Sequence, residues 1–282
     1  MEALIARACT RMSRNPSPVT AEQPWHLDAA IRSARIGAHD WPYIDTGGNR
    51  PALVMLPGSV GTCEMFFKQI ASLRDRLRII SVGYPAEPDP ATLAAGLAAL
   101  MDTLNLSTAS VLGSSFGGYW AQFFALRHAE RVETLFLGNI FVTPDELFAN
   151  PLFAPDFVRA TAAADLQATW RGRVAQAPDS ELKRIQLDML DGRQSAENLR
   201  ARFLGVIGAT LCPPLPVPQQ RIVIVDCADD PIIPPASRQA VRDRYPQAEV
   251  ATLPTGGHYP HILNPDAYDA VIVRRLTNRS TA

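Results

Sequence analysis

The chain has 282 residues, of which 47% are hydrophobic and 20% are charged, so it can bury a sizeable core and is not disordered as a whole. Its formal net charge of −1 gives no basic footprint for binding DNA or RNA. No apolar run approaches the roughly 20 residues of a membrane-spanning helix, so no membrane span is expected.

Residues 1–30 are predicted to form a poorly ordered arm, because their apolar stretch is too short and interrupted for a secretory signal and Glu2 is atypical of organellar targeting. The cysteines are widely spaced and form no C-x-x-C pair, which fits neither a zinc site nor a disulfide framework. Reduced thiols in a cytoplasmic protein are therefore expected for Cys9, Cys63, Cys212 and Cys227.

Strand-like and helix-like segments alternate along most of the chain. Short apolar runs bounded by Gly or Pro predict strands at 52–56, 77–82, 109–112, 132–137, 221–226 and 249–253. Apolar residues at helical spacing predict helices around 66–73 and at 91–104, 117–128, 235–245 and 265–276. This alternation predicts parallel βαβ units and hence an α/β fold with a doubly wound, mostly parallel sheet.

The segment 141–217 interrupts the alternation. It carries helix-like stretches at 156–170 and 179–190, scattered aromatic residues and no strand signal, and it ends in the proline-rich CPPLPVP at 212–218. The alternative is a further helical layer of the core. We expect a helical cap over one end of a single core formed by 31–140 and 218–282.

A G-x-S-x-G pattern at 113–117 follows the strand predicted at 109–112 and precedes the helix predicted at 117–128. This strand–turn–helix setting is the one that a nucleophile elbow requires, and it singles out Ser115 as the nucleophile. A phosphate-binding loop is the alternative, but the G-K-[ST] of a P-loop and the G-x-G-x-x-G of a dinucleotide site are both absent.

A serine nucleophile needs a base that a carboxylate orients. In folds with a nucleophile elbow, the three residues follow one another along the chain in the order Ser, acid, His. Asp230 lies in the loop after the strand at 221–226 and just before Pro231, which favours it as the acid. Asp229 is the main alternative, and Asp226, still on the strand, is a weaker one.

The base must follow the last strand, at 249–253. His258 lies in the glycine-rich TGGHYPH at 255–261 and is the favoured base, with His261 as the alternative. His128 falls late in a predicted helix, and His26 and His39 precede the core.

The oxyanion of such a reaction needs two backbone N–H donors. One should come from Phe116, which follows the nucleophile, and the other from the loop LPGSVGT at 56–62. Ser59 is the favoured donor in this loop and Val60 the alternative. An ordinary Gly/Pro turn is the plainer interpretation of the loop.

From about residue 36 to 276, the sequence resembles the α/β-hydrolase superfamily, through GSSFGG at 113–118, CADDPIIP at 227–234 and GGHYP at 256–260. Within it, the segments at 57–70, 113–122 and 245–260 are most similar to the maspardin-like α/β hydrolases, whose type member is regarded as a catalytically compromised interaction protein of endosomal traffic. This chain differs from that type member in the direction of catalytic activity, because Ser115, Asp230 and His258 are all present. It also carries Pro57-Gly58 where the superfamily usually has His-Gly in the oxyanion loop.

These observations predict a serine hydrolase that cleaves carboxylic esters or thioesters through Ser115, His258 and Asp230, without a metal or an organic cofactor. The aromatic residues of the cap favour an apolar acyl or alcohol group in a small-molecule substrate. The open alternatives are a non-catalytic interaction protein, and a hydrolase of C–C or amide bonds that uses the same triad.

Overall fold

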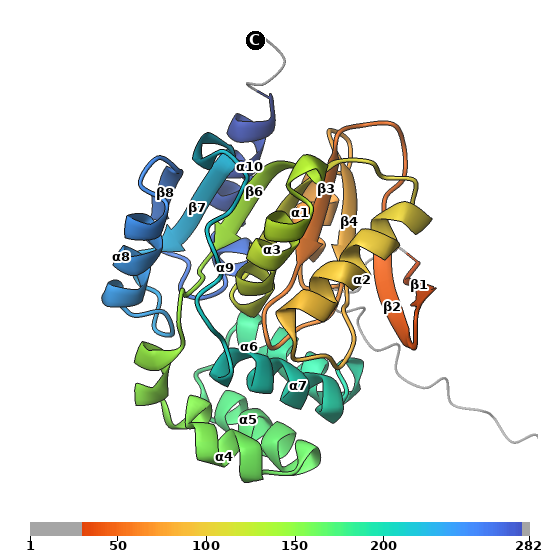
Figure 1. Cartoon of the computed structure of the whole chain (residues 1–282). Helices are drawn as coiled ribbons and strands as arrows, with labels where there is room; N and C mark the ends of the chain where they lie inside the picture. Colours follow the sequence, from red (N-terminus) through yellow and green to blue (C-terminus); the bar gives the residue numbers. More distant parts are fainter. Residues whose placement is uncertain (1–29, 278–282) are drawn as a thin grey trace, which may run out of the picture.

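A computed structural model describes residues 30–277, and the predicted arm at 1–30 lies almost entirely outside them. The strands are β1 Arg32–Ile36, β2 His39–Asp45, β3 Ala52–Leu56, β4 Arg78–Val82, β5 Ala109–Ser114, β6 Val132–Gly138, β7 Ile222–Cys227 and β8 Glu249–Leu253. They form one sheet in the order β1-β2-β4-β3-β5-β6-β7-β8 (Figure 1). β2 is antiparallel to both neighbours and the remaining pairs are parallel, which confirms the predicted mostly parallel sheet.

Ten α-helices accompany the sheet within the described residues. They are α1 Phe67–Leu73, α2 Pro90–Thr103, α3 Phe116–Arg127, α4 Pro155–Ala160, α5 Ala163–Gln176, α6 Glu181–Asp188, α7 Ala196–Ile207, α8 Pro235–Arg244, α9 Pro260–Leu263 and α10 Pro265–Thr277. Short 3₁₀ segments are η1 Ala129–Arg131, η2 Asp145–Ala149, η3 Pro151–Phe153 and η5 Gln219–Arg221, and η4 Met189–Arg193 is a π-helical turn. No helix in this part of the chain is long and apolar enough to cross a membrane.

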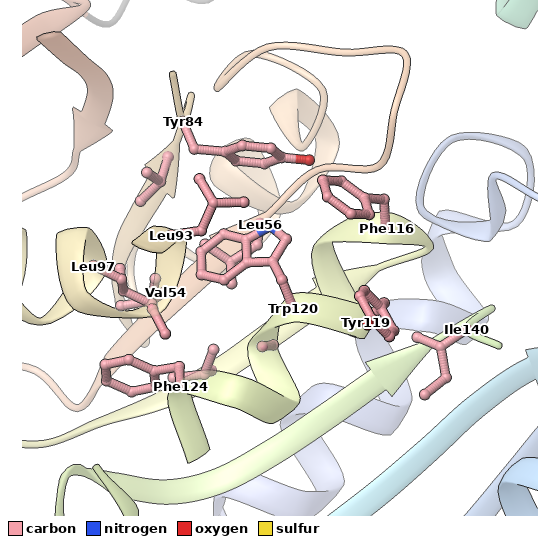
Figure 2. Close-up of a cluster of buried hydrophobic side chains, with 14 of the residues drawn as sticks. Val54, Leu56, Tyr84, Leu93, Leu97, Phe116, Tyr119, Trp120, Phe124 and Ile140 are labelled. Carbon is pink, nitrogen blue, oxygen red and sulfur yellow. The ribbon is translucent and has the colours of Figure 1, made fainter. Parts of the chain in front are cut away.

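The central strands are apolar on both faces because helices cover both sides of the sheet. In β3, Val54 and Leu56 point into a cluster with α2, α3 and α8, whereas Leu53 and Met55 point into a second cluster with α1 and α10. Figure 2 shows part of the first cluster, in which Trp120 of α3 packs edge-to-face against the ring of Tyr84. Every residue of β5 and β7 is buried.

The hairpin of β1 and β2 has no counterpart among the strands predicted from the sequence. Its segments RSARI and HDWPYID alternate only weakly and contain Pro42, which is tolerated because it lies just before the register of β2 with β4 begins at Tyr43. Trp41 is nevertheless buried, and its indole packs against Gly96 of α2. One tertiary contact thus anchors a hairpin whose own sequence gives little strand signal.

The segment 141–217, between β6 and β7, contains only helices and irregular structure, and we refer to it as the cap. In Figure 1 its helices α4 to α7 lie together beyond one end of the sheet. The helix predicted at 156–170 is two helices in the structure, because the chain is extended at Thr161 and Ala162. The cap residues Phe153, Leu199 and Phe203 belong to the same buried cluster as α2 and α3.

The start of α3 lies directly against the end of β3. A Cβ atom placed on Gly117 would collide with the carbonyl oxygens of Leu56 and Pro57, and one on Gly113 would collide with the backbone of α3. Backbone atoms cannot move aside as a flexible side chain can. The glycines of the G-x-S-x-G pattern are therefore required by the approach of helix to strand.

We predict that Gly117→Ala destabilises the fold by at least about 2 kcal/mol, as expected for overpacking against backbone. The matched control is Gly172→Ala in α5, where a Cβ meets nothing within 4 Å. It should raise stability by up to about 1 kcal/mol through helix propensity. Urea unfolding of both variants checks this, and equal effects of the two substitutions would contradict the close contact at Gly117.

Candidate active site

Ser115 occupies the sharp turn between β5 and α3. Its backbone has φ 53° and ψ −125°, a conformation that is uncommon and strained for a residue with a side chain. Its N–H donates to the carbonyl of Gly138 at 2.7 Å, which holds the turn against β6. The turn leaves Ser115 partly exposed while its neighbour Ser114 is buried.

The loop after β8 brings His258 to this serine. The Nε2 atom of His258 lies 3.0 Å from Oγ of Ser115, within hydrogen-bond distance. The imidazole is only 9% exposed, so most of its surroundings are protein rather than water. The hydroxyl can therefore pass its proton directly to the ring nitrogen.

Asp230, in the loop after β7, lies on the other side of the imidazole. Its carboxylate oxygens are 3.0 and 3.2 Å from Nδ1 of His258, and its side chain is fully buried. The N–H groups of Ile232 and Ile233 donate to Oδ1 at 2.7 and 3.0 Å. Burial alone would raise the pKa of Asp230, but His258 and these hydrogen bonds outweigh it and lower the pKa, which keeps the carboxylate ionised.

The alternative acids do not reach His258. Asp229 accepts the N–H groups of Gly256 and Gly257 at 3.2 and 2.9 Å, so it ties the loop after β7 to the loop that carries the histidine. Asp226 forms an ion pair with Arg242 of α8.

His261, the alternative base, is buried in the second cluster rather than beside Ser115. Its ring lies 4.9 Å from that of Phe66 and 6.0 Å from that of Tyr268, measured between centroids. Burial, assisted by the nearby His258 and Lys68, lowers the pKa of His261 to about 3. It is therefore a neutral core histidine at ordinary pH.

Asn139 belongs to the site although it was not among the residues singled out in the sequence. It follows β6 with φ 47°, and its Nδ2 donates to Oδ2 of Asp230 at 2.7 Å and to the carbonyl of Gly257 at 3.2 Å. The amide therefore holds the acid and the histidine loop together. Its signal in the sequence is a single polar residue just after a buried strand, where parallel strands present their functional side chains.

The loop that follows β3 runs close to Ser115. A Cβ on Gly58 would stand 3.1 Å from Cβ and 3.7 Å from Oγ of Ser115, so the backbone of this loop runs beside the hydroxyl. Phe116 is the first residue of α3, whose first N–H groups have no partner within the helix. Ser59 and Val60 lie in the approaching loop, which brings the expected donor segments near the serine.

A cavity of about 330 Å³ opens above Ser115 and His258, between the sheet edge and the cap. The residues that line it beside Ser115 are mostly apolar. The cap contributes Leu152, Phe153, Trp170, Val174, Ala177, Leu182 and Phe203. Arg173 and Asn150 add polar groups to the lining.

Residues 30–277 contain no cluster of three or more His, Cys, Asp or Glu side chains that could hold a metal ion. The polar groups around Ser115 are a hydroxyl, an imidazole and a carboxylate within hydrogen-bond distance of one another, an arrangement along which a proton can move.

Comparison with known proteins shows which family the chain belongs to. A family described as "Alpha/beta hydrolase family" matches residues 53–271. Human maspardin is 27% identical over 230 residues, which cover 79% of this chain and 74% of maspardin. A putative carbamate hydrolase RutD from Caulobacter sp. (strain K31) is 23% identical over 252 residues, which cover 82% of this chain and 92% of that protein.

Solved structures show the same fold. The enol-lactonase from Burkholderia xenovorans LB400 superposes with a TM-score of 0.72 at 21% identity and covers 87% of this chain and 100% of its own. A thermophilic esterase from Thermogutta terrifontis gives 0.71 at 23% identity, covering 89% and 99%. With the family match spanning most of the chain, these findings identify the chain as a member of the alpha/beta hydrolase family.

Proposed function

We propose that the chain is a serine hydrolase that cleaves carboxylic esters or thioesters through an acyl-enzyme intermediate. The observation that carries the proposal is the continuous hydrogen-bonded chain from Oγ of Ser115 through His258 to Asp230, with distances of 3.0 Å at both nitrogens. The family membership and the names of the similar proteins, an enol-lactonase, an esterase and a putative carbamate hydrolase, support hydrolysis at an activated carbonyl.

In the first half of the reaction, Oγ of Ser115 attacks the carbonyl carbon while its proton passes to Nε2 of His258. Asp230 stabilises the imidazolium that forms, and the N–H groups of Phe116 and Ser59 stabilise the oxyanion. The tetrahedral intermediate then collapses, and His258 gives the proton to the leaving alcohol or thiol. The acyl group remains on Ser115 as an ester.

In the second half, a water molecule takes the place of the leaving group. His258 accepts one proton from the water as its oxygen attacks the acyl carbon, and returns a proton to Oγ of Ser115 when the second intermediate collapses. The carboxylic acid leaves, and serine and histidine return to their starting protonation states.

We propose that the acyl group is apolar and that the substrate is a small molecule handled in the cytoplasm without a cofactor. The apolar cap residues around the cavity support the first point. Cys63, Cys212 and Cys227 are buried and free, as in a reducing compartment. Hydroxyl, imidazole and carboxylate supply the nucleophile and the proton transfers that the reaction needs.

Two other functions remain as alternatives. The similarity to maspardin favours a non-catalytic interaction protein. Hydrolysis of a C–C or amide bond would use the same three residues with a different leaving group. The first alternative predicts an unreactive Ser115, and the second predicts a reactive serine with poor ester turnover.

A fluorophosphonate probe tests the nucleophile. It should label the wild-type protein and the control Ser107→Ala, which changes an exposed serine before β5, but not Ser115→Ala. Labelling is followed by mass spectrometry of the intact protein. A folded wild-type protein that takes up no probe would rule out the serine hydrolase and favour the interaction protein.

Replacement of the two neighbouring acids tests the triad. Asp230→Asn should lower kcat by about 10⁴-fold, because the imidazole loses the carboxylate that orients it. Asp229→Asn should lower kcat by about 10-fold at most, since Asp229 only holds the histidine loop through backbone N–H groups. The reverse order of the two losses would show that the acid is Asp229.

A panel of p-nitrophenyl esters from acetate to octanoate tests the substrate class. The value of kcat/KM should rise by up to about fourfold per methylene until the cavity is filled. Val174→Phe should move the optimum to shorter chains, because Val174 lines the cavity from α5, whereas Gly172→Ala on the same helix should not. A flat profile in the wild-type protein would contradict an apolar acyl site.

A further inference from the structure

Arg202, in the middle of α7, is a buried cation that the proposed triad does not use. The residue is 1% exposed, and the ion pairs of the described residues do not include it. Burial lowers its pKa, yet arginine side chains stay protonated in proteins. A buried charge without a counter-ion is strongly unfavourable unless hydrogen bonds replace its lost water, so its partners show what it is placed to do.

The nearest partners are in the loop that approaches Ser115, and Nη2 of Arg202 also donates to the carbonyl oxygen of Tyr84 at 3.5 Å. Nη1 of Arg202 donates to the carbonyl oxygens of Gly58 and Gly61, both at 2.7 Å. The guanidinium carbon lies 3.8 Å from the centre of the Tyr84 ring. The Tyr84 hydroxyl in turn donates to the carbonyl of Pro57 at 2.7 Å and lies 3.2 Å from that of Gly58.

The oxygen of Gly58 and the N–H of Ser59 belong to one peptide group. The described residues contain no cis peptide, and in a trans peptide the oxygen and the N–H point in opposite directions. A cation that holds the oxygen therefore also fixes the direction of the N–H. A charged donor on the oxygen polarises the amide as well, which makes the N–H a stronger hydrogen-bond donor.

We propose that Arg202 is a positioning residue for the oxyanion hole, acting through the Gly58–Ser59 peptide to direct and strengthen the N–H of Ser59. The inference rests on the proposed hydrolase function. It adds a component from the cap: a charge on α7 that never touches substrate and stabilises the oxyanion through one peptide group.

Gln194 holds the next peptide in the same way but without charge. Its Nε2 donates to the carbonyl of Ser59 at 2.8 Å, and its Oε1 accepts the N–H of Gly61 at 3.0 Å. The oxygen of Ser59 shares its peptide with the N–H of Val60. Both candidate donors are therefore held from the cap, and the charge on the first peptide favours Ser59 over Val60.

Steady-state kinetics of the full chain give the first test. Arg202→Met should lower kcat by about 100-fold with KM nearly unchanged, as expected when an oxyanion donor is weakened. Tyr84→Phe should cause a smaller loss, and Arg202→Lys an intermediate one. The matched control is Arg200→Met on the same helix, because Arg200 bonds only the carbonyls of Thr161 and Arg159 within the cap.

A ligand pair separates positioning from a merely structural role. An alkyl trifluoromethyl ketone adds to Ser115: the Oγ–C bond forms, the carbonyl electron pair becomes an oxyanion, and the serine proton goes to His258. The matching methyl ketone fills the same cavity without adding. Arg202→Met should weaken the first ligand in proportion to its loss of kcat/KM and change the second by about twofold at most, whereas a distorted cavity would weaken both.

Further outcomes would overturn the inference, and two other variants decide it if Arg202→Met does not fold. If Arg202→Met fails to fold, the decision passes to Tyr84→Phe and Arg202→Lys, and unchanged trifluoromethyl ketone affinity in both would overturn the inference. An equal loss of kcat in Arg202→Met and Arg200→Met would also overturn the inference, but it would leave the proposed hydrolase function standing. A wild-type protein that neither labels nor hydrolyses would overturn the proposed function, and this inference with it.

Discussion

The direct contact between the start of α3 and the end of β3 is the constraint on which the candidate site depends. Because Gly117 stands against the carbonyls of Leu56 and Pro57, the turn before α3 places Ser115 beside the loop that follows β3. β3 and β5 are adjacent and parallel, so their carboxyl ends meet at one edge of the sheet. The strands that follow in the sheet, β6, β7 and β8, then bring their own loops to the same edge, with Asn139, Asp230 and His258.

The parts of this arrangement that the sequence predicts are those with a local signature. Ser115 is marked by its glycines, and the order of the strands places an acid and a histidine after it in the chain. Asn139 and Arg202 have no such signature: one is a lone amide after a strand, and the other is an arginine in an amphipathic helix that is buried through its packing against the core. The β1–β2 hairpin was missed for the same reason, since Trp41 is buried by a distant helix rather than by a pattern in its own strand.

The cap is part of the core rather than a separate layer. Its apolar residues share one buried cluster with α2 and α3, and α7 approaches so closely that a Cβ on Gly205 would collide with the ring of Phe116. Arg202 and Gln194 join the same cap to the loop after β3 through four hydrogen bonds to its backbone. Swinging α7 away would expose that apolar surface and remove the Arg202 donor from the carbonyls of Gly58 and Gly61. On the α7 side, the cavity is therefore bounded by a helix that both apolar packing and hydrogen bonds hold against the core.

Three unfavourable features meet within this one region. Ser115 holds a left-handed backbone, Asp230 keeps an ionised carboxylate out of water, and Arg202 is a buried cation without a carboxylate. Glycine would relieve the strain at the turn, an amide would avoid burying a charge, and an apolar side chain on α7 would remove the buried cation, although each change would also break contacts that the structure makes. A surface that only binds a partner protein requires none of the three. In the proposed acyl transfer each of them has a task, because the reaction uses a presented hydroxyl, an oriented imidazole and a prearranged donor for the oxyanion. Their convergence favours the hydrolase over the interaction protein.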